Sequence, residues 1–462
     1  MFVTKAVGRS SFRDPSGRVF ESDGVLYRSV ASSYRPHYDA LFSSGLYESL
    51  TSSGLLVPHE EVDPDIGRAT DVYRVIRPER IPFISYPYEW SFSALKDAAL
   101  ATLRIQSTAL DHGMSLKDAS AFNVQFRNGE PVLIDTLSFE IYEEETPWAA
   151  YRQFCQHFVT PLALMSYVDV RLGLLMKLYV DGIPLDLGSN LLPRRSRFSI
   201  GTKLHIHSHA KSMQKHSHAG VGVREMKGRF SRRAFRGFID SLTSTIKSYQ
   251  WQPSGTEWAD YYSEADHYSH ESLEVKKRVV ATYLDELRPS LVFDLGANTG
   301  VFSRLASERG ALTVSLDADP AVVEVNYRKM VANDEDDLLP LVFDLTNPSP
   351  GIGWANAERD ALDRRGVADV GMALALIHHL VIGNNVPFAL LASYFSSLCR
   401  SLIIEFVPKD DPKVQGLLAS REDVFGDFNE KSFEEAFEEH FAIGRRTEIS
   451  GTGRSIYLMT RR

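Results

Sequence analysis

The sequence predicts an α/β protein, with a doubly wound, mainly parallel sheet in its C-terminal part and an α+β domain before it. Short apolar strands and helices alternate from about residue 290 onward. Within that region, residues 291–307 form a strand, a glycine turn and an amphipathic helix in direct succession. Hairpins followed by helices occupy the chain before residue 190. We therefore expect three parts, residues 1–190, 191–285 and 286–462.

The elements of residues 1–190 follow from turn residues and apolar spacing. The Ser22-Asp23-Gly24 turn separates two β-rich stretches and predicts a hairpin. Apolar residues such as Leu95, Ala99 and Leu103 recur at near-helical intervals and predict a helix. We expect a hairpin over 17–31, two strands over 71–90, a helix over 92–112 and mostly helical, apolar structure over 147–187.

Residues 191–285 are predicted to be a basic, His-rich connector followed by helices. Twelve Lys or Arg but only one acid, Glu225, occur between residues 191 and 236. Two alternatives remain open for this stretch. One is a basic surface for an anionic substrate or for the other domain. The other is a metal site, which is disfavoured because no acid or cysteine accompanies the histidines at ligand spacing. The histidines are His205, His207, His209, His216 and His218.

The C-terminal part begins with the motif LVFDLGANTGVFSRLAS at 291–307. Its apolar strand ends in Asp294, and Gly296 and Gly300 bracket a tight turn that contains Asn298. Glycines suit this place because the backbone must turn sharply and approach a ligand closely. The following helix N-terminus offers N–H groups and a partial positive charge, which would suit the carboxylate of a ligand.

Acidic residues also end the next two predicted strands. Asp317 closes the strand over 311–320, where a carboxylate can accept hydrogen bonds from both hydroxyls of a ribose. Asp344 lies near the end of the strand over 338–345, where it can accept from an adenine amino group. A fourth strand is expected within 368–380, which ends in a segment of small residues and histidines. A fifth is expected over 401–407 and carries Glu405.

Because these carboxylates lie at the ends of successive strands, residues 290–460 resemble the class I S-adenosylmethionine-dependent methyltransferases. The D-L-G-A-N-T-G motif matches the glycine-rich first motif of that family. The resemblance implies a Rossmann-like, seven-stranded sheet and S-adenosyl-L-methionine as cofactor. A nicotinamide-binding fold would need G-x-G-x-x-G, but the two glycines are four residues apart. The implied cofactor-binding residues are Asp294, Gly296, Asn298, Gly300, Asp317 and Asp344.

The candidate catalytic residues are His379 and His378, which follow the fourth strand where the acceptor meets the methyl group in the resembled family. Methyl transfer depends mainly on alignment of the two reactants. A histidine can also deprotonate a hydroxyl or amine nucleophile, and we favour His379 for this role. Packing of either ring is the alternative. An aromatic cluster before the first strand would cover the cofactor or simply pack: Trp258, Tyr261, Tyr262 and Tyr268.

A weaker resemblance concerns the N-terminal part. Asp118, Asn123 and Asp135 are spaced similarly to the catalytic loop and metal-binding Asp of protein-kinase-like folds. The sequence departs from that pattern, because it lacks a glycine-rich nucleotide loop and places Arg28 near the position of the usual lysine. We expect either a degenerate kinase-like domain or an unrelated α+β domain. Added phosphotransferase activity and a non-catalytic, cofactor-sensing role remain alternatives to methyl transfer.

Composition limits the classes of partner and the cellular location that we expect for the protein. The net charge of −9 argues against a general nucleic-acid binder, which needs excess Lys and Arg. Cys155 and Cys399 are expected to be buried and free. No apolar run has the length of a membrane span or signal peptide, so we expect a cytoplasmic protein without a membrane partner. The whole chain is similar to bacterial nodulation-type methyltransferases, which implies a small-molecule or glycan-like acceptor.

Overall fold

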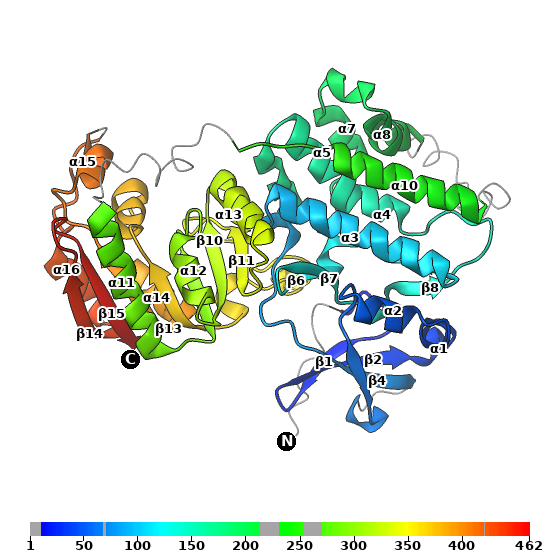
Figure 1. The fold of residues 1–462 in the computed structure, drawn as a ribbon, viewed down its shortest axis with the longest axis horizontal. Coiled ribbons are helices and arrows are strands. Elements are labelled where there is room, and N and C mark those ends of the chain that lie inside the picture. The colour runs from blue at the N-terminus through cyan, green and yellow to red at the C-terminus, as the bar shows by residue number, and fades with distance from the viewer. Residues whose placement is uncertain (1–10, 68–70, 213–230, 254–269, 420) are drawn as a thin grey trace. The chain divides into compact units, whose positions relative to one another are not determined.

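The computed structural model describes residues 11–67, 71–212, 231–253, 270–419 and 421–462 (Figure 1). The chain forms two compact units. Unit 1 comprises residues 1–252 together with 351–359, and unit 2 comprises 253–350 together with 360–462. No helix in the described ranges is long and apolar enough to cross a membrane.

Unit 2 contains a seven-stranded sheet with the strand order β11-β10-β9-β12-β13-β15-β14. Only β15 runs antiparallel to its two neighbours. The chain moves outward from β9 to β11 and then returns to the other side of β9, so β9 and β12 flank a topological switch point. The predicted Rossmann-like, seven-stranded sheet is confirmed. Its strands are β9 (Leu291–Leu295), β10 (Leu312–Asp317), β11 (Leu338–Val342), β12 (Ala368–Ala373), β13 (Cys399–Phe406), β14 (Phe441–Glu448) and β15 (Ser455–Arg461).

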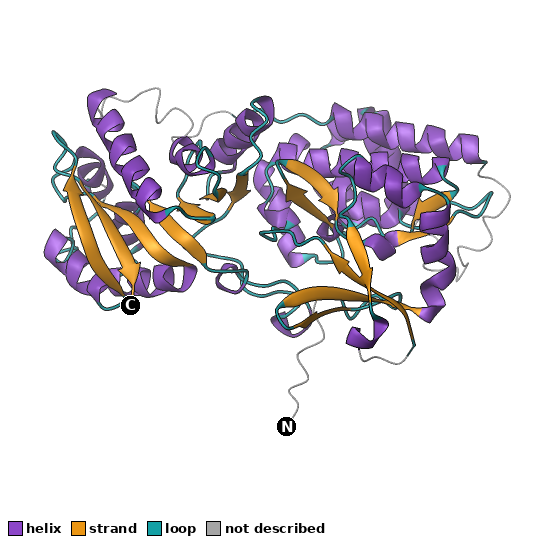
Figure 2. Cartoon of the chain, turned by 60° about the horizontal axis from the view of Figure 1, so that its bottom comes forward, coloured by secondary structure: helices purple, strands orange, loops and turns teal. Residues whose placement is uncertain are grey.

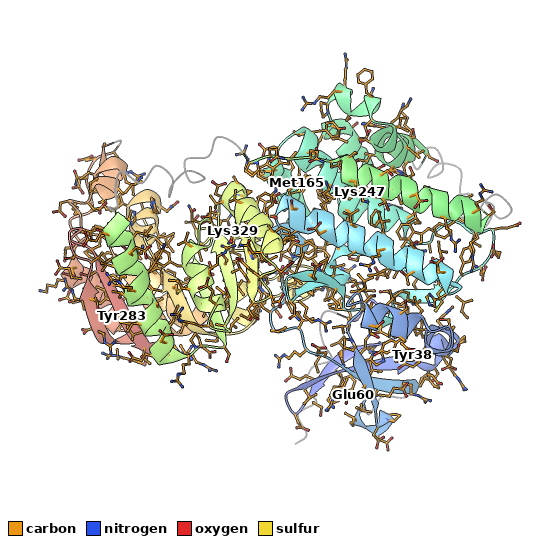
Figure 3. All side chains as sticks on the ribbon, in the orientation of Figure 1. Tyr38, Glu60, Met165, Lys247, Tyr283 and Lys329 are labelled. Atoms are coloured by element: carbon orange, nitrogen blue, oxygen red, sulfur yellow. The ribbon has the colours of Figure 1, made fainter. Side chains whose placement is uncertain are left out.

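The helices of unit 2 enclose this sheet, and Figure 2 shows them as purple ribbons around the orange strands. Val292 and Met372 of the central strands are fully buried, as expected for a parallel sheet covered by helices. Tyr283 of α11 packs toward β14, where its hydroxyl lies 2.6 Å from that of Thr447 (Figure 3). The helices are α11 (His270–Leu287), α12 (Val301–Ser307), α13 (Pro320–Ala332), α14 (Phe388–Leu398), α15 (Pro412–Leu418) and α16 (Glu430–Glu438).

Unit 1 begins with an antiparallel sheet in the order β1-β2-β4-β3. The predicted hairpin is confirmed, because β1 pairs with β2 across a turn in which Asp23 and Gly24 have positive φ. The strands are β1 (Val19–Ser22), β2 (Val25–Ala31), β3 (His59–Val62) and β4 (Val72–Pro78). Tyr38 of α1 (Arg35–Ser43) is buried in this part of the core, and α2 (Leu46–Ser52) follows (Figure 3).

The prediction of two strands over 71–90 is wrong in its second half. Only β4 forms there, and the chain beyond Pro78 is irregular apart from a short 3-10 turn over Pro87–Glu89. Pro78, Pro82 and Pro87 lack an N–H group, so this stretch cannot donate a regular ladder of hydrogen bonds. The predicted helix over 92–112 is confirmed as α3 (Phe92–Asp111), whose first turn is capped by the Ser91 hydroxyl.

The rest of unit 1 is two short strand pairs and a group of helices. Strand β5 (Met114–Leu116) pairs with β8 (Phe139–Ile141), and β6 (Val124–Arg127) pairs with β7 (Glu130–Leu133). Cys155 and, in unit 2, Cys399 are buried free cysteines. The helices include α4 (Tyr151–Phe154), α5 (Thr160–Tyr167), α6 (Leu175–Leu178), α7 (Leu185–Leu191), α8 (Ile200–Thr202) and α10 (Arg232–Ser248).

Residues 351–359, between β11 and β12 in sequence, belong to unit 1. Two of these residues contact other parts of that unit. Glu358 accepts from the Arg13 guanidinium at 2.9 Å. The Arg359 guanidinium lies 4.6 Å from the centre of the Phe122 ring. The chain therefore leaves unit 2 at residue 350 and returns to it at residue 360.

Candidate cofactor and acceptor site

The glycine turn after β9 has the backbone that its sequence predicts. Gly296, Asn298 and Gly300 have φ angles of 74°, 52° and 77°, the left-handed region that favours glycine and asparagine. A Cβ atom at Gly296 would lie 2.9 Å from Cδ1 of Leu376. A Cβ atom at Gly300 would lie 2.4 Å from Oδ1 of Asn326. The turn therefore has no room for a side chain at either glycine.

Asp317 lies at the end of β10, beside this turn. One carboxylate oxygen accepts the N–H of Asn298 at 2.8 Å and the other accepts the N–H of Asp319 at 2.9 Å. Burial raises the pKa of Asp317, while these backbone hydrogen bonds lower it. A third backbone N–H, that of Ala318, also lowers the pKa of this carboxylate. A carboxylate has about four lone-pair sites, so Asp317 can still accept a hydrogen bond from a ligand. This geometry fits a ligand that presents hydroxyl groups, such as a ribose.

Asp294 lies inside the protein. Its side chain is buried in β9 and accepts the Ser303 hydroxyl at 2.6 Å. Burial raises its pKa to about 7, with the nearby Asp317 charge acting in the same direction and Lys276 acting against it. Asp294 therefore links β9 to α12 below the turn.

Asp344 follows β11 by two residues, because that strand ends at Val342 and not at residue 345 as predicted. Its exposed carboxylate accepts the N–H of Thr346 at 2.8 Å and the Thr346 hydroxyl at 2.7 Å. It lies past the same edge of the sheet as Asp317, since β10 and β11 are parallel.

The histidine pair follows β12, and β12 runs parallel to β9. The residues after both strands therefore leave the sheet at one edge, and Leu376 packs against Gly296. His378 is fully buried, and neither of its ring nitrogens hydrogen-bonds to a described residue. Burial lowers its pKa well below the ordinary value. The partly buried His379 has its pKa lowered to about 4 by burial and by Lys413 and Arg454.

Both imidazoles are therefore neutral at neutral pH. Their ring centres are 4.1 Å apart, so protonation of one ring would disfavour protonation of the other. A neutral imidazole can accept a proton from an acceptor hydroxyl, but a pKa near 4 makes it a weak base. Chemistry at this site would depend mainly on positioning.

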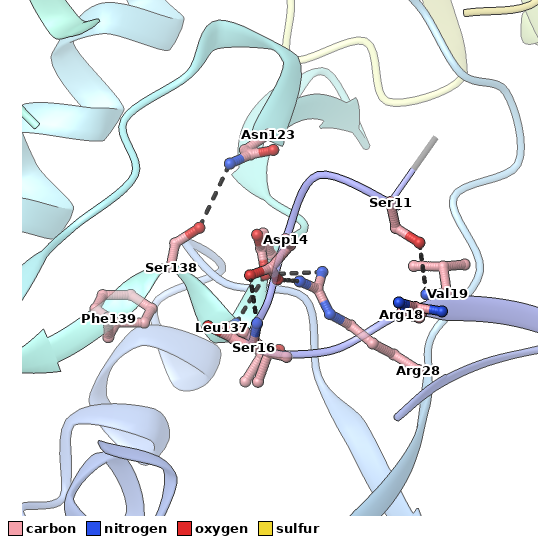
Figure 4. A network of polar contacts seen from close by, with 12 residues as sticks. Ser11, Asp14, Ser16, Arg18, Val19, Arg28, Asn123, Leu137, Ser138 and Phe139 are labelled. Atoms are coloured by element: carbon pink, nitrogen blue, oxygen red, sulfur yellow. Dashed lines mark hydrogen bonds and ion pairs between the residues drawn. The ribbon is translucent and has the colours of Figure 1, made fainter. Parts of the chain in front are cut away.

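The predicted kinase-like residues of unit 1 lie near one another but are engaged internally. Asp118 has its pKa raised by burial and by the charge of Asp135, whereas a hydrogen bond from Asn123 lowers it. Arg28 forms an ion pair with Asp135 at 2.8 Å. It forms another with Asp14 (Figure 4). The guanidinium thus supplies a positive charge where a kinase would hold a metal ion. Among the described residues, no group of three or more His, Cys, Asp or Glu could hold a metal ion.

The predicted histidine-rich segment and aromatic cluster have different outcomes. His205 is within hydrogen-bonding distance of Tyr151 and Ser241, and His207 of Ser189 and Ser196. His209 stacks on the Tyr151 ring. Several predicted residues lie outside the described part of the chain: His216, His218, Trp258, Tyr261, Tyr262 and Tyr268.

Comparison with known proteins assigns the family. The chain is 34% identical over 456 residues to the nodulation protein NoeA of Rhizobium meliloti (strain 1021). The match covers 98% of this chain and 95% of that protein. The chain belongs to the NoeA family. A scan against protein-family models found no match.

Similar solved structures include three methyltransferases. The magnesium protoporphyrin IX methyltransferase of Synechocystis PCC 6803 is 20% identical, with 41% of this chain and 84% of that one covered and a TM-score of 0.31. The N-methyltransferase NodS of Bradyrhizobium japonicum WM9 is 9% identical, with 42% and 98% covered and a TM-score of 0.32. The bifunctional kinase-methyltransferase WbdD is 18% identical, with 47% and 45% covered and a TM-score of 0.30.

In this NoeA-family chain, the structure adds buried charged residues that sequence reasoning did not place at the site. Lys276 of α11 donates to Glu405 of β13 at 2.7 Å, and both side chains are buried. The same Glu405 oxygen accepts the N–H of Ala375 at 2.6 Å, three residues before His378. Arg454 lies between Glu405 and Asp411, at 3.5 and 2.7 Å. An acid within the apolar strand SLIIEFV was the available signal, because a buried carboxylate needs a buried cation.

Arg304 of α12 is a second addition. Its guanidinium donates to the carbonyl oxygens of Thr299 and Gly300, at 2.9 and 3.0 Å, and to the Asn326 side chain at 2.8 Å. These bonds fix the last part of the glycine turn from below. The only sequence signal was an arginine one helical turn after Gly300, a spacing that many helices share.

Proposed function

We propose that this protein transfers a methyl group from S-adenosyl-L-methionine to an oxygen or nitrogen atom of a small-molecule or glycan-like acceptor. The single observation that carries this proposal is the pairing of the glycine turn after β9 with Asp317 at the end of β10. Asp317 retains capacity to accept a hydrogen bond from a ligand, and the turn excludes side chains at Gly296 and Gly300.

Each predicted binding residue has a distinct role in this proposal. The Gly296–Gly300 turn lets the backbone approach the cofactor closely. Asp317 accepts from the ribose hydroxyls, and Asp344 accepts from the adenine amino group. Asp294 acts indirectly, since its carboxylate is buried against Ser303. When bound, the cofactor supplies an electrophilic methyl group on a sulfonium centre.

The protein contributes alignment and a proton acceptor. His379 follows β12 at the edge of the sheet where the turn lies, and its neutral ring can take the proton from an acceptor hydroxyl or amine. Glu405 positions the backbone before the histidines through the Ala375 N–H. The glycan-like acceptor rests on the resemblance to nodulation-type methyltransferases.

Native mass spectrometry of the purified full-length chain tests the proposal. We expect the cofactor or its demethylated product to be retained, together with an acceptor that gains the mass of one methylene unit on incubation. Retention of cofactor with no methylated product from any retained acceptor would favour the cofactor-sensing alternative. Failure to bind the cofactor at all would contradict both methyl transfer and the cofactor-sensing alternative.

A further inference from the structure

Three apolar side chains project into solvent within seven residues of unit 1. Phe198 is 88% exposed, Ile200 is 85% exposed and Leu204 is 46% exposed. Isolated exposed apolar residues are common on soluble proteins, but a group of this kind marks an interaction surface. Here an aromatic ring and two branched aliphatic chains are presented by one short stretch.

The stretch that carries them is helical and two-sided. Residues 200–212 are continuously helical, through α8 and the wider turn over Lys203–Ser208. Thr202 and Ile206 are fully buried and hold the inner side against unit 1. Ile200, Lys203 and Leu204 lie on the opposite, exposed side. The buried inner side therefore holds the helix in place, and no residue in the described part of the chain buries the apolar side chains of the outer side.

The charged residues nearest to these side chains in the sequence are all basic. Arg194, Arg197 and Lys203 are exposed, and none of them pairs with a carboxylate in the part of the chain that the structure describes. No Asp or Glu occurs between Asp186 and Glu225. The whole chain carries a net charge of −9, so this local positive charge opposes the overall balance. We call Arg194, Arg197, Phe198, Ile200, Lys203 and Leu204 the basic apolar face.

We propose that the basic apolar face docks this protein on the surface of an anionic lipid bilayer. Phe198, Ile200 and Leu204 enter the interfacial region, while Arg194, Arg197 and Lys203 pair with lipid phosphates. Lipid matches this face better than a protein partner does, because separate projecting side chains insert between headgroups without a complementary groove. The docking is peripheral and is compatible with the absence of a spanning helix among the described residues. It does not depend on methyl transfer.

Co-sedimentation of the full-length chain with vesicles tests this docking. One vesicle population is phosphatidylcholine alone and the other contains about one third phosphatidylglycerol. We expect binding to the phosphatidylglycerol vesicles that falls as salt rises, because surface charges are screened. Binding to phosphatidylcholine vesicles should be weaker by about tenfold or more.

Two variants separate the two contributions. F198S/I200S/L204S removes the apolar side chains and should lower vesicle binding about tenfold or more at any salt concentration. R194Q/R197Q/K203Q should lower binding to phosphatidylglycerol vesicles to the level seen with phosphatidylcholine alone. The matched control is Val424→Ser, because Val424 is 71% exposed but lies beside Glu422 and Asp423. It should bind as the unaltered chain does.

Circular dichroism and thermal melting establish that each variant is folded, which is expected because the altered side chains are exposed. Equal binding of the unaltered chain to both vesicle types, or no binding to either, would overturn the proposal. The face would then be a surface for an acidic protein. Loss of binding in Val424→Ser to the same extent as in the apolar triple variant would also overturn it.

Discussion

At the scale of single residues, Asp317 is the sharpest test of the cofactor site. Asp317→Ala removes the acceptor for the ribose hydroxyls and should weaken S-adenosyl-L-methionine binding by about 1.5–3 kcal/mol, the scale of hydrogen bonds to a charged group. Isothermal titration calorimetry measures this directly. Asp336→Ala, which alters an exposed carboxylate before β11, is the control and should bind normally. Unchanged affinity in a folded Asp317→Ala protein would remove Asp317 from the site.

The two histidines should separate into different roles. His379→Ala should lower turnover by about 10²–10⁴-fold with nearly unchanged cofactor affinity, because the loss falls on the transition state. His378→Ala should act mainly through stability, since the His378 ring is fully buried. Steady-state kinetics and urea unfolding of both variants measure these effects. If His378→Ala lowers turnover and His379→Ala lowers only stability, the two roles are exchanged. Full activity in both variants would mean that the protein contributes to catalysis only by aligning the reactants.

The pH dependence of turnover follows from the lowered pKa of His379. Its folded-state pKa of about 4 lies below the ordinary histidine value, so the ring stays neutral and able to accept a proton as pH falls through 6.5. Turnover that depends on His379 should therefore be level between about pH 6 and 8 and should decline only toward pH 4. A pH–rate profile measures this. A fall in turnover below about pH 6.5 that is absent in His379→Ala would contradict this expectation. It would show that the His379 ring is not desolvated in the working enzyme.

At the scale of elements, the loop after β12 depends on a charge held by β13. Glu405→Gln keeps the shape of the side chain but removes the negative charge that Lys276 and Arg454 share. Both cations would then stay buried without that carboxylate. Loss of one partner of a buried ion pair costs about 3–5 kcal/mol, and urea unfolding should show a loss of that order. The control is Glu274→Gln, which alters a partly exposed ion pair with Lys277 on α11, the helix that carries Lys276. It should cost about 1 kcal/mol or less. Similar losses in both variants would mean that the buried network does not stabilise the fold.

The same elements explain what could be predicted from the sequence. The turn at Gly296 and Gly300 and the position of Asp317 at a strand end were predictable because a tight turn and a strand-end acid leave local signals. Lys276 and Arg454 were missed because their partner, Glu405, is more than 40 residues away from each of them in sequence. The strand over 79–90 was overpredicted because aromatic and apolar content outweighed two prolines, Pro82 and Pro87. The order of strands in the sheet also depends on contacts between distant segments, which apolar spacing alone does not encode.

At the scale of the whole molecule, unit 1 raises the question of a second activity. Asp118, Asn123 and Asp135 lie near one another as the kinase-like resemblance implies, yet the Arg28 guanidinium pairs with Asp135. A bound nucleotide would stabilise the folded chain by mass action, by about 2.7 kcal/mol at a hundred times its Kd. Because Arg28 already neutralises Asp135, we expect ATP with magnesium to leave the thermal unfolding of the full-length chain unchanged. S-adenosyl-L-methionine should raise the melting temperature in the same assay and serves as the positive control. A clear rise with magnesium and ATP that Asp135→Asn abolishes would contradict this expectation and would favour a bifunctional enzyme.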